Sequence, residues 1–311
     1  MTTEQRTDAA AAGTIALGGD LIVNRMGFGA MRITGQGVWG EPSNRSEAIR
    51  VLRRAVELGV NFIDTADSYG PNVSEEIIAE ALFPYRTGGV IATKGGFERS
   101  GPNAWTENGR PDHLRRALDG SLRRLKLDRI DLWQLHRIDA SVPEDEQFGV
   151  LAEFVREGKV KHVGLSEVGV DQIERARRIV PIVSVQNKYN ASERDWEDVV
   201  DYCGREQIAF IPWAPLRAGN LDNSPRRGLK AANRATGKGS QTLERANESL
   251  RIVAERRKAT PKQVALAWLL ARSPVMLIIP GTSQTKHLEE NVAAASLRLD
   301  AADIALLNGA R

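Results

Sequence analysis

Short apolar runs rich in β-branched residues recur along the chain and alternate with segments of helical periodicity. The runs cover residues 26–31, 62–64, 90–93, 130–136, 160–166, 182–186, 208–213 and 275–279. Each run is followed by a helical pattern, which is the βα alternation of a parallel sheet. Eight such units favour closure into a barrel over an open, doubly wound sheet. We therefore predict an α/β fold, a (β/α)8 TIM barrel.

The helical segments show apolar stripes at intervals of three and four residues, with start and stop signals at their ends. We expect helices over residues 45–58, 111–125, about 148–155 and 262–272. Residues 14–17 and 21–23 flank Gly18-Gly19, which predicts a β-hairpin before the first barrel strand. A last helical pattern, from about residue 300 to 307, is an extra C-terminal helix behind the eight units.

The chain of 311 residues has no linker-like break and no fixed-period repeat, so we expect a single domain over residues 14–311. Residues 1–13 are small and polar, and we expect a disordered N-terminal tail there. This stretch lacks the charged and apolar regions of a signal peptide. The longest purely apolar run, residues 264–271, is far short of the roughly 20 residues that span a bilayer.

Composition excludes several classes of protein. Charged residues make up 27% and hydrophobic residues 41%, so the chain is globular rather than disordered or fibrous. A net charge of +3 is too small for a chain of this size to imply a polyanion partner by itself, and we expect no nucleic acid partner. The single Cys203 forms no internal disulfide, and the four histidines lack ligand spacing, so we expect no metal. A cytoplasmic protein without a membrane partner, a monomer or weak homo-oligomer, is the expectation.

One segment departs from this average. Residues 217–240 carry six basic residues against one Asp, a local charge of +5, directly after the seventh predicted strand. At that end of a barrel, we expect a flap over an anionic ligand. A solvated surface loop is the plain alternative. A nucleic-acid patch is a weak third reading because no aromatic residues are interleaved with the basic ones.

A glycine pattern between the first strand and the first helix imitates a dinucleotide-binding fingerprint. Gly35, Gly37 and Gly40 match G-x-G-x-x-G, and Asp64 ends the next strand. However, the last glycine stops before the helix, and the bulky Trp39 stands where a pyrophosphate would approach the backbone. We favour a substrate-side loop of the barrel over the Rossmann interpretation.

A stronger signal comes from polar residues at the carboxyl ends of successive strands. Asp64 ends the second strand, with Tyr69 five residues later, Lys94 ends the third and His136 ends the fourth. These ends converge on one face of a barrel. Lys94 can stabilise a Tyr69 phenolate, Asp64 can hold Lys94, and a neutral His136 can donate to a substrate carbonyl. No side chain donates hydride, so a nicotinamide must.

Taken singly, Asp64 reads as a turn cap, Lys94 as part of a surface ion pair and His136 as a strand-end histidine. Their occurrence together makes those readings improbable. Residues 61–70, NFIDTADSYG, and the order of Asp64, Tyr69, Lys94 and His136 resemble the aldo-keto reductase family, from about residue 15 to the C-terminus. The resemblance implies an NADPH-dependent (β/α)8 barrel that reduces aldehydes or ketones without a metal, with Tyr69 as general acid.

The resemblance also implies cofactor positions. Ser166 and Gln186 match the residues that bind the carboxamide, and Trp213 matches the aromatic residue that stacks on the nicotinamide. Glu167 stands where Asn is usual. Residues 279–291 resemble the segment that binds the adenosine end at a helix N-terminus. The remaining implied positions are Ala214, Pro215, Leu216, Gly281, Thr282, Ser283, His287, Glu290 and Asn291. Gly281 and His287 replace basic or amide residues of many relatives, so NADH is the alternative to NADPH.

Loop sequences at 35–42, 69–73, 80–85 and 279–283 are similar to the bacterial pyridoxal reductase-like branch of the family. That similarity implies reduction of pyridoxal to pyridoxine as the reaction on a small carbonyl substrate. Trp39, Phe97 and Trp105 are the aromatic candidates for the substrate wall, unless they only pack the loops. An alternative of another class is an NADP(H)-binding regulatory subunit that senses redox state with little turnover.

Overall fold

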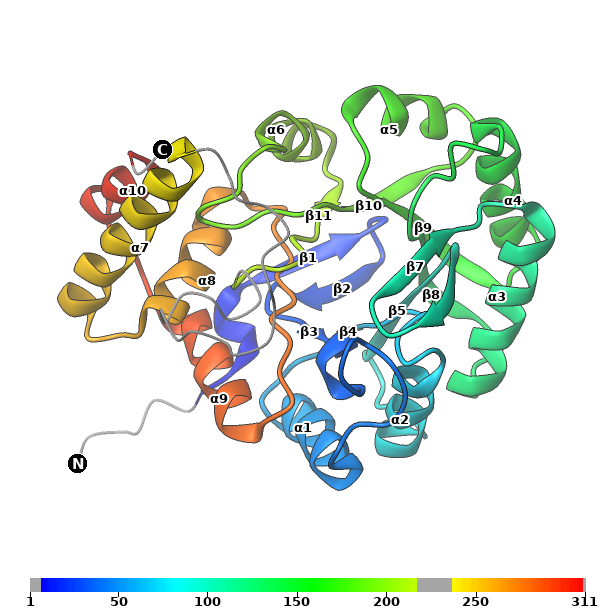
Figure 1. Ribbon diagram of the computed structural model, residues 1–311, viewed down its shortest axis with the longest axis horizontal. Helices are drawn as coiled ribbons and strands as arrows, with labels where there is room; N and C mark the ends of the chain where they lie inside the picture. The colour runs from blue at the N-terminus through cyan, green and yellow to red at the C-terminus, as the bar shows by residue number, and fades with distance from the viewer. Residues whose placement is uncertain (1–6, 217–236, 310–311) are drawn as a thin grey trace.

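A curled parallel sheet forms the centre of the protein, and helices surround it (Figure 1). The computed structural model describes residues 7–216 and 237–309, without the side chains of 237–243. In order around the sheet, the strands are β3 (Phe28–Gly29), β4 (Phe62–Asp64), β5 (Val90–Gly95), β8 (Ile130–Leu135), β9 (Val160–Ser166), β10 (Ile182–Gln186) and β11 (Ala209–Phe210).

The eighth predicted strand closes this sheet through isolated bridges. Met276 pairs with Phe210 on one side, and Ile278 pairs with Met26 on the other. Backbone N–H groups of Leu277 and Ile278 donate at 2.9 Å to the carbonyls of Phe210 and Arg25. The predicted α/β barrel is therefore confirmed, with its last segment held on both sides.

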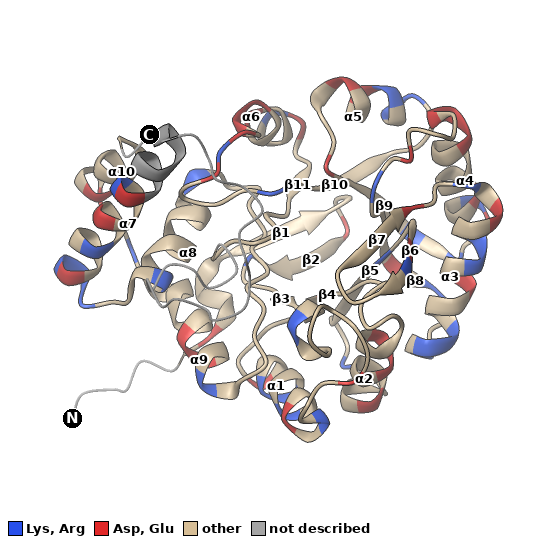
Figure 2. Cartoon of the chain, in the orientation of Figure 1, with Lys and Arg blue, Asp and Glu red and all other residues tan. Residues whose placement is uncertain are grey.

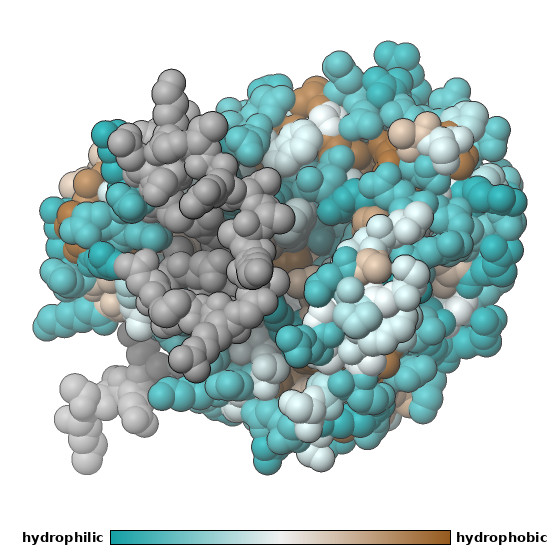
Figure 3. Space-filling model, viewed as in Figure 1, coloured by the Kyte–Doolittle hydropathy of each residue, from teal (hydrophilic) through white to brown (hydrophobic). Residues whose placement is uncertain are grey.

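The outer helices are α1 (Arg45–Glu57), α2 (Val73–Leu82), α3 (Pro111–Leu125), α4 (Glu144–Arg156), α5 (Val170–Arg177), α6 (Glu197–Glu206), α7 (Gly237–Arg257), α8 (Pro261–Arg272), α9 (Thr285–Ala293) and α10 (Ala301–Asn308). Side-chain caps fix several starts, such as Asn44 for α1 and Thr260, with Gln263, for α8. Most charged residues lie on these helices, and the strands carry few (Figure 2). The face shown in Figure 3 is mainly hydrophilic, with hydrophobic residues scattered over it.

Three sequence predictions need correction. The first strand, expected over 26–31, is only Phe28–Gly29, because a 3-10 helix (Ala30–Ile33) follows at once. The strand expected over 208–213 is Ala209–Phe210. The expected disordered tail is wrong for residues 8–13, where Asp8 caps a second 3-10 helix (Ala9–Ala12) with Ala9 fully buried.

Two hairpins form small sheets separate from the barrel sheet. The predicted one is present as β1 (Thr14–Leu17) and β2 (Leu21–Asn24). Its Leu17 and Val23 pack with Phe62 and Leu132, from the barrel strands, in one apolar cluster. The second hairpin, β6 (Phe97–Gly101) and β7 (Ala104–Glu107), was not predicted. It inserts between β5 and α3, directly after the end of a barrel strand.

The inward-facing side chains of the barrel strands are apolar in the middle of the barrel and polar at its carboxyl end. Phe62, Val90, Ala92 and Leu132 belong to the interior apolar cluster. Two residues further along their strands, Asp64, Lys94 and Gln134 point to the same side, since side chains repeat every second residue. The carboxyl end of the barrel therefore carries buried polar side chains above an apolar floor.

Part of the basic segment at residues 217–240, expected to fold over an anionic ligand, lies outside the described residues, and α7 begins at Gly237. Within residues 7–216 and 237–309, no helix is long and apolar enough to cross a membrane. The same part of the chain holds no group of three or more His, Cys, Asp or Glu that could bind a metal.

Candidate active site

A buried ion pair lies at the carboxyl end of β4 and β5. Lys94 Nζ donates to Asp64 Oδ1 at 2.6 Å and to the Thr65 carbonyl at 2.7 Å. The side chains are 0% and 2% exposed. Burial alone would lower the pKa of Lys94, but the charge of the Asp64 carboxylate beside it raises the pKa above its ordinary value. Lys94 is therefore a fixed cation.

The second carboxylate oxygen of Asp64 is held by two amides from across the barrel. Gln134 Nε2 donates to Oδ2 at 3.1 Å and Gln186 Nε2 donates to it at 2.9 Å. All three residues are almost fully buried. Gln134, on β8, is register partner to Lys94 on β5, which brings its amide to this layer. Asp64 thus accepts from Lys94 and both amides and keeps its orientation.

Tyr69 lies in the loop after β4, beside this pair. Its ring centroid is 5.2 Å from Lys94 Nζ. Burial raises the pKa of the Tyr69 hydroxyl, and the positive charge of Lys94 offsets only part of that effect. As expected, the positive charge of Lys94 favours the phenolate and lowers the pKa of Tyr69, but burial of the hydroxyl has the larger, opposite effect. Tyr69 therefore holds its proton at neutral pH.

His136 directly follows β8 and completes the predicted group of four. Its ring centroid lies 5.8 Å from that of Tyr69. Burial, reinforced by the charges of Lys94, Arg137 and Arg99, holds the pKa of His136 well below its ordinary value. The imidazole is neutral, as predicted, and a neutral imidazole has one N–H to donate.

The three aromatic residues expected at the substrate wall gather around this group. Phe97 and Trp105 come from the β6–β7 hairpin, with ring centroids 4.6 and 6.3 Å from that of His136. Trp105 also meets Tyr69 edge to face at 6.3 Å. Trp39 comes from the loop before α1 and forms a backbone bridge with Gly70, next to Tyr69.

Arg99 connects the segments that carry these aromatic residues. Its guanidinium lies 3.6 Å from the ring centroid of Trp105 and 5.6 Å from that of Trp39. Its five N–H groups donate to backbone carbonyls at 2.6 to 3.2 Å, those of Gly37, Val38, Ser68, Gly101 and Ala104. One side chain thereby joins the loop before α1, the residue before Tyr69 and the hairpin.

The cofactor candidates at the ends of β9, β10 and β11 also lie together. Ser166 Oγ accepts from Arg137 Nη1 at 2.8 Å. Glu167 Oε1 accepts from Trp213 Nε1 and from the Lys188 backbone N–H, both at 2.6 Å. Glu167, which replaces the usual Asn, therefore fixes the indole of Trp213 in this structure. Ala214, Pro215 and Leu216 continue the chain from that indole.

The segment before α9 lies against the first strand. A Cβ on Gly281 would stand 2.4 Å from the Gly29 carbonyl, so no larger residue fits there without a shift. Arg32 Cγ is 3.7 Å from the same position. Thr282, Asn291 and Leu288 are buried, whereas Ser283, Lys286 and His287 are exposed.

Two carboxylates occupy this helix region. At the start of α9, Glu47 Oε1 accepts from both N and Oγ1 of Thr285, at 3.1 and 2.9 Å. Glu290, a predicted cofactor residue, accepts from Thr260 Oγ1 at 2.8 Å through its own carboxylate. A phosphate at this helix N-terminus would therefore share it with Glu47, beside Arg32 and Lys286. The cofactor positions in this segment stay predictions.

A family model described as the aldo/keto reductase family matches residues 25–311. The chain belongs to the aldo/keto reductase family. It is 50% identical to an uncharacterized oxidoreductase of Schizosaccharomyces pombe, covering 97% of this chain and 90% of the relative. It is 41% identical to pyridoxine 4-dehydrogenase of Escherichia coli, covering 92% and 94%. A solved glycerol dehydrogenase from Gluconobacter oxydans aligns with a TM-score of 0.85 at 25% identity, covering 96% and 95%.

Membership in this family of NAD(P)H-dependent oxidoreductases raises the question of whether the site suits a nicotinamide. A carboxamide offers one acceptor oxygen and one NH2 donor. Because Ser166 Oγ accepts from Arg137, its hydroxyl hydrogen is left to donate. Because Gln186 Nε2 is committed to Asp64, its Oε1 is left to accept among the described residues. This donor and acceptor set fits a carboxamide.

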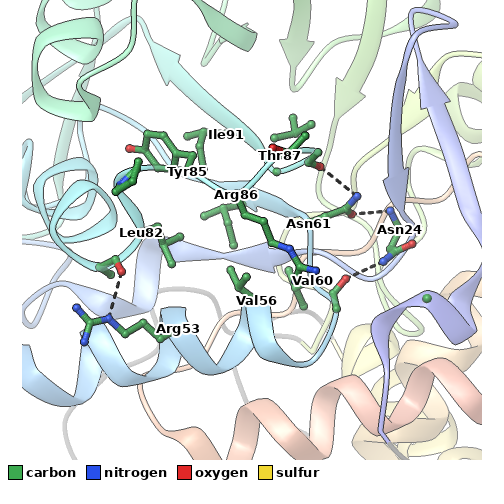
Figure 4. A pocket seen from close by; sticks show the side chains of 18 of the residues that line it. Asn24, Arg53, Val56, Val60, Asn61, Leu82, Tyr85, Arg86, Thr87 and Ile91 are labelled. Atoms are coloured by element: carbon green, nitrogen blue, oxygen red, sulfur yellow. Dashed lines mark hydrogen bonds between the residues drawn. The ribbon is translucent and has the colours of Figure 1, made fainter.

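A separate cavity of about 530 Å³ opens at the other end of this aldo/keto reductase barrel (Figure 4). It lies between α1, the end of α2 and the start of β5, and none of the predicted site residues lines it. Several of its polar groups form hydrogen bonds within the wall. Asn24 donates to Asn61 and Gly59 at 2.7 Å, and Arg53 donates to the Ala81 carbonyl at 3.2 Å.

Sequence reasoning missed three functional candidates of the aldo/keto reductase site: Gln134, Arg99 and Arg137. Gln134 interrupts the apolar strand 130–135, and a polar residue at an inward position was the signal available for it. Arg137 follows His136 and could have been noticed as a charge at a strand end. Arg99 gave no signal, because its partners are backbone carbonyls of its own hairpin and of two distant loops.

Proposed function

We propose that this protein reduces an aldehyde or ketone to the alcohol, with NADPH as hydride source and Tyr69 as general acid. One observation carries the proposal. A protonated Tyr69 lies beside the buried Asp64–Lys94 pair and a neutral His136, at the carboxyl end of the barrel. That set can bind a carbonyl oxygen and protonate it.

In this mechanism His136 donates its N–H to the substrate oxygen and polarises the carbonyl. A nicotinamide held by Ser166 and Gln186 would supply the hydride to the carbonyl carbon. As negative charge develops on the oxygen, Tyr69 transfers its proton, and the phenolate that remains is stabilised by Lys94. Asp64, held by Gln134 and Gln186, keeps Lys94 charged and in place.

We propose that Ser166 and Gln186 hold the carboxamide and that Trp213, fixed by Glu167, is the stacking surface for the ring. The segment from Gly281 to Asn291 would hold the adenosine end. Arg32 and Lys286 support NADPH, since they add cations near the helix that begins at Thr285. NADH is the alternative cofactor.

Pyridoxal is the substrate we propose, reduced to pyridoxine. The support is the Escherichia coli relative named pyridoxine 4-dehydrogenase, at 41% identity over nearly the whole chain. The aromatic wall of Trp39, Phe97 and Trp105 is suited to an aromatic aldehyde, because ring faces and edges attract one another.

The experiment compares initial rates of NADPH and NADH oxidation with pyridoxal and with a panel of other aldehydes. We expect turnover of pyridoxal with NADPH and a lower kcat/KM with NADH. Turnover of other aldehydes without pyridoxal would remove the substrate assignment alone. Binding of NADPH with no oxidation on any carbonyl would overturn the proposed activity.

A further inference from the structure

Two arginines lie at the barrel mouth, and they differ in how far their hydrogen-bonding capacity is used. A guanidinium has five N–H groups and no acceptor. All five N–H groups of Arg99 donate to backbone carbonyls. Arg137 donates only through Nη1, to the His136 carbonyl at 2.6 Å and to Ser166 Oγ at 2.8 Å. Within residues 7–216 and 237–309, its Nε and Nη2 have no hydrogen-bond partner.

Arg137 is also a partly buried charge without an ion pair in the part of the chain that the structure describes. Burial lowers the pKa of Arg137, and the nearby charges of Glu167 and Glu107 offset only part of that effect. No ion pair joins Arg137 to Glu167 or Glu107 among the described residues, and Glu167 Oε1 accepts instead from Trp213 and Lys188. The one ring near its guanidinium in the described chain is Phe97, 5.6 Å away. Buried charges in proteins are normally paired, so this one has capacity for an anionic partner.

The position of Arg137 relates that capacity to the substrate. It directly follows His136, and the Phe97 ring lies against both residues. The charge of Arg137 also reaches Tyr69, where it offsets a small part of the rise in pKa that burial causes. Of the other cations near the site, Lys94 is paired with Asp64, and Arg99 donates all its N–H groups to backbone carbonyls. Arg137 therefore has N–H groups available for a ligand. It is also next in sequence to His136, which would bind the carbonyl oxygen.

We propose that Arg137 binds a negatively charged oxygen that neighbours the carbonyl of the substrate, and so selects carbonyl compounds carrying such a group. This inference rests on the proposed function and names its substrate class. On an aromatic aldehyde the group is an oxyanion ortho to the formyl group. Pyridoxal belongs to this class, since its phenolic oxygen is on the ring carbon next to the one bearing the aldehyde.

The test uses 2-sulfobenzaldehyde, 4-sulfobenzaldehyde and benzaldehyde, because a sulfonate is charged at any working pH. At saturating NADPH, the ratio of kcat/KM for the ortho isomer to that for benzaldehyde is measured in wild type, Arg137→Met and Arg137→Lys. A charge-assisted contact predicts that this ratio falls roughly ten- to hundredfold in Arg137→Met. Arg137→Lys, which keeps the charge and loses the fork, should fall in between.

Two controls isolate the effect. Using a ratio within each variant cancels any change in cofactor binding caused by losing the contact to Ser166, and the NADPH dissociation constant is measured separately by fluorescence. Arg116→Met removes an exposed arginine on α3, outside the site, and should leave the ratio unchanged. The para isomer should lose less than the ortho isomer in Arg137→Met.

An unchanged ortho ratio in an Arg137→Met protein that still reduces benzaldehyde would overturn this inference and leave the proposed function standing. If wild type reduces none of the aldehydes, the proposed function fails instead. Binding then decides the inference: calorimetry with 2- and 4-(hydroxymethyl)benzenesulfonate on NADPH-saturated wild type needs no turnover. Tighter binding of the ortho isomer, lost in Arg137→Met, supports it, and equal affinities overturn it.

Discussion

Lys94 Nζ lies 2.6 Å from Asp64 Oδ1, and both side chains are hidden from solvent inside the barrel. Removing one partner of a buried pair leaves the other charge uncompensated, which costs about 3–5 kcal/mol. We expect Asp64→Asn to lose that much free energy of unfolding, measured by urea denaturation. It should also lower kcat, because Asp64 is a main cause of the raised pKa of Lys94.

The matched control is Asp119→Asn. Asp119 pairs with Lys159 at 3.1 Å, but the side chains are 45% and 41% exposed. An exposed pair of this kind contributes about 0–1 kcal/mol. Equal losses of stability in the two variants would contradict the buried role assigned to Asp64.

A second prediction concerns the pH dependence of reduction. The pKa of His136 is held well below its ordinary value, and those of Tyr69 and Lys94 lie above theirs. None of the three groups then changes charge near pH 6.5, the ordinary pKa of histidine. We expect log kcat/KM for reduction to show no inflection around that pH. An inflection near pH 6.5 would show that His136 titrates with an ordinary pKa, contrary to this account.

The barrel and the group of four could be predicted because both follow from local pattern. Strand alternation and strand ends locate Asp64 and Lys94 on one face, whatever the exact length of each strand. The predicted boundaries were wrong at the first strand, which ends at Gly29, where the chain lies close to Gly281 and a 3-10 helix begins.

The supporting residues could not be predicted for a related reason. Glu167 and Trp213 are 46 positions apart, and their hydrogen bond exists only because β9 and β11 end at the same rim. Arg99 lies in a hairpin of mixed polar residues that shows no hydrophobic periodicity. Its role depends on backbone carbonyls of two loops and its own hairpin, and every residue type has a carbonyl, so the sequence cannot indicate these partners.

A third prediction rests on Asp67, a buried carboxyl in the loop that carries Tyr69. Burial and the nearby charge of Glu75 raise the pKa of Asp67 to about 8. Between about pH 4 and pH 8 the folded protein therefore binds one more proton than the unfolded chain, so its stability falls as pH rises, by at most about 1.4 kcal/mol per pH unit from this group.

Asp67→Asn removes that dependence. Relative to wild type, the variant should gain stability progressively from pH 5 to pH 8, and the gain should level off above the pKa of Asp67. Urea midpoints at a series of pH values measure it, with the exposed Asp128→Asn as control. A gain that shrinks as pH rises would contradict the protonated state assigned to Asp67.

The aromatic wall supplies a fourth prediction. Arg99→Met removes five hydrogen bonds and the contact with Trp105. We expect KM for aromatic aldehydes to rise roughly tenfold, equivalent to about 1.4 kcal/mol of lost positioning. The NADPH dissociation constant should change less, because Arg99 contacts none of the proposed cofactor residues. A larger effect on cofactor affinity than on KM would contradict the proposal that Arg99 positions the aromatic substrate wall.

Proton donation by Tyr69 is the central claim, and single-turnover reduction by Tyr69→Phe tests it most directly. Wild type and variant, each saturated with NADPH, are mixed with pyridoxal, or with benzaldehyde if pyridoxal is not turned over, and the loss of cofactor absorbance is followed. Removing the phenol should slow the hydride-transfer phase by roughly 10²–10⁴-fold, the usual contribution of a general acid, while NADPH still binds. Equal rates in the two proteins would contradict the mechanism.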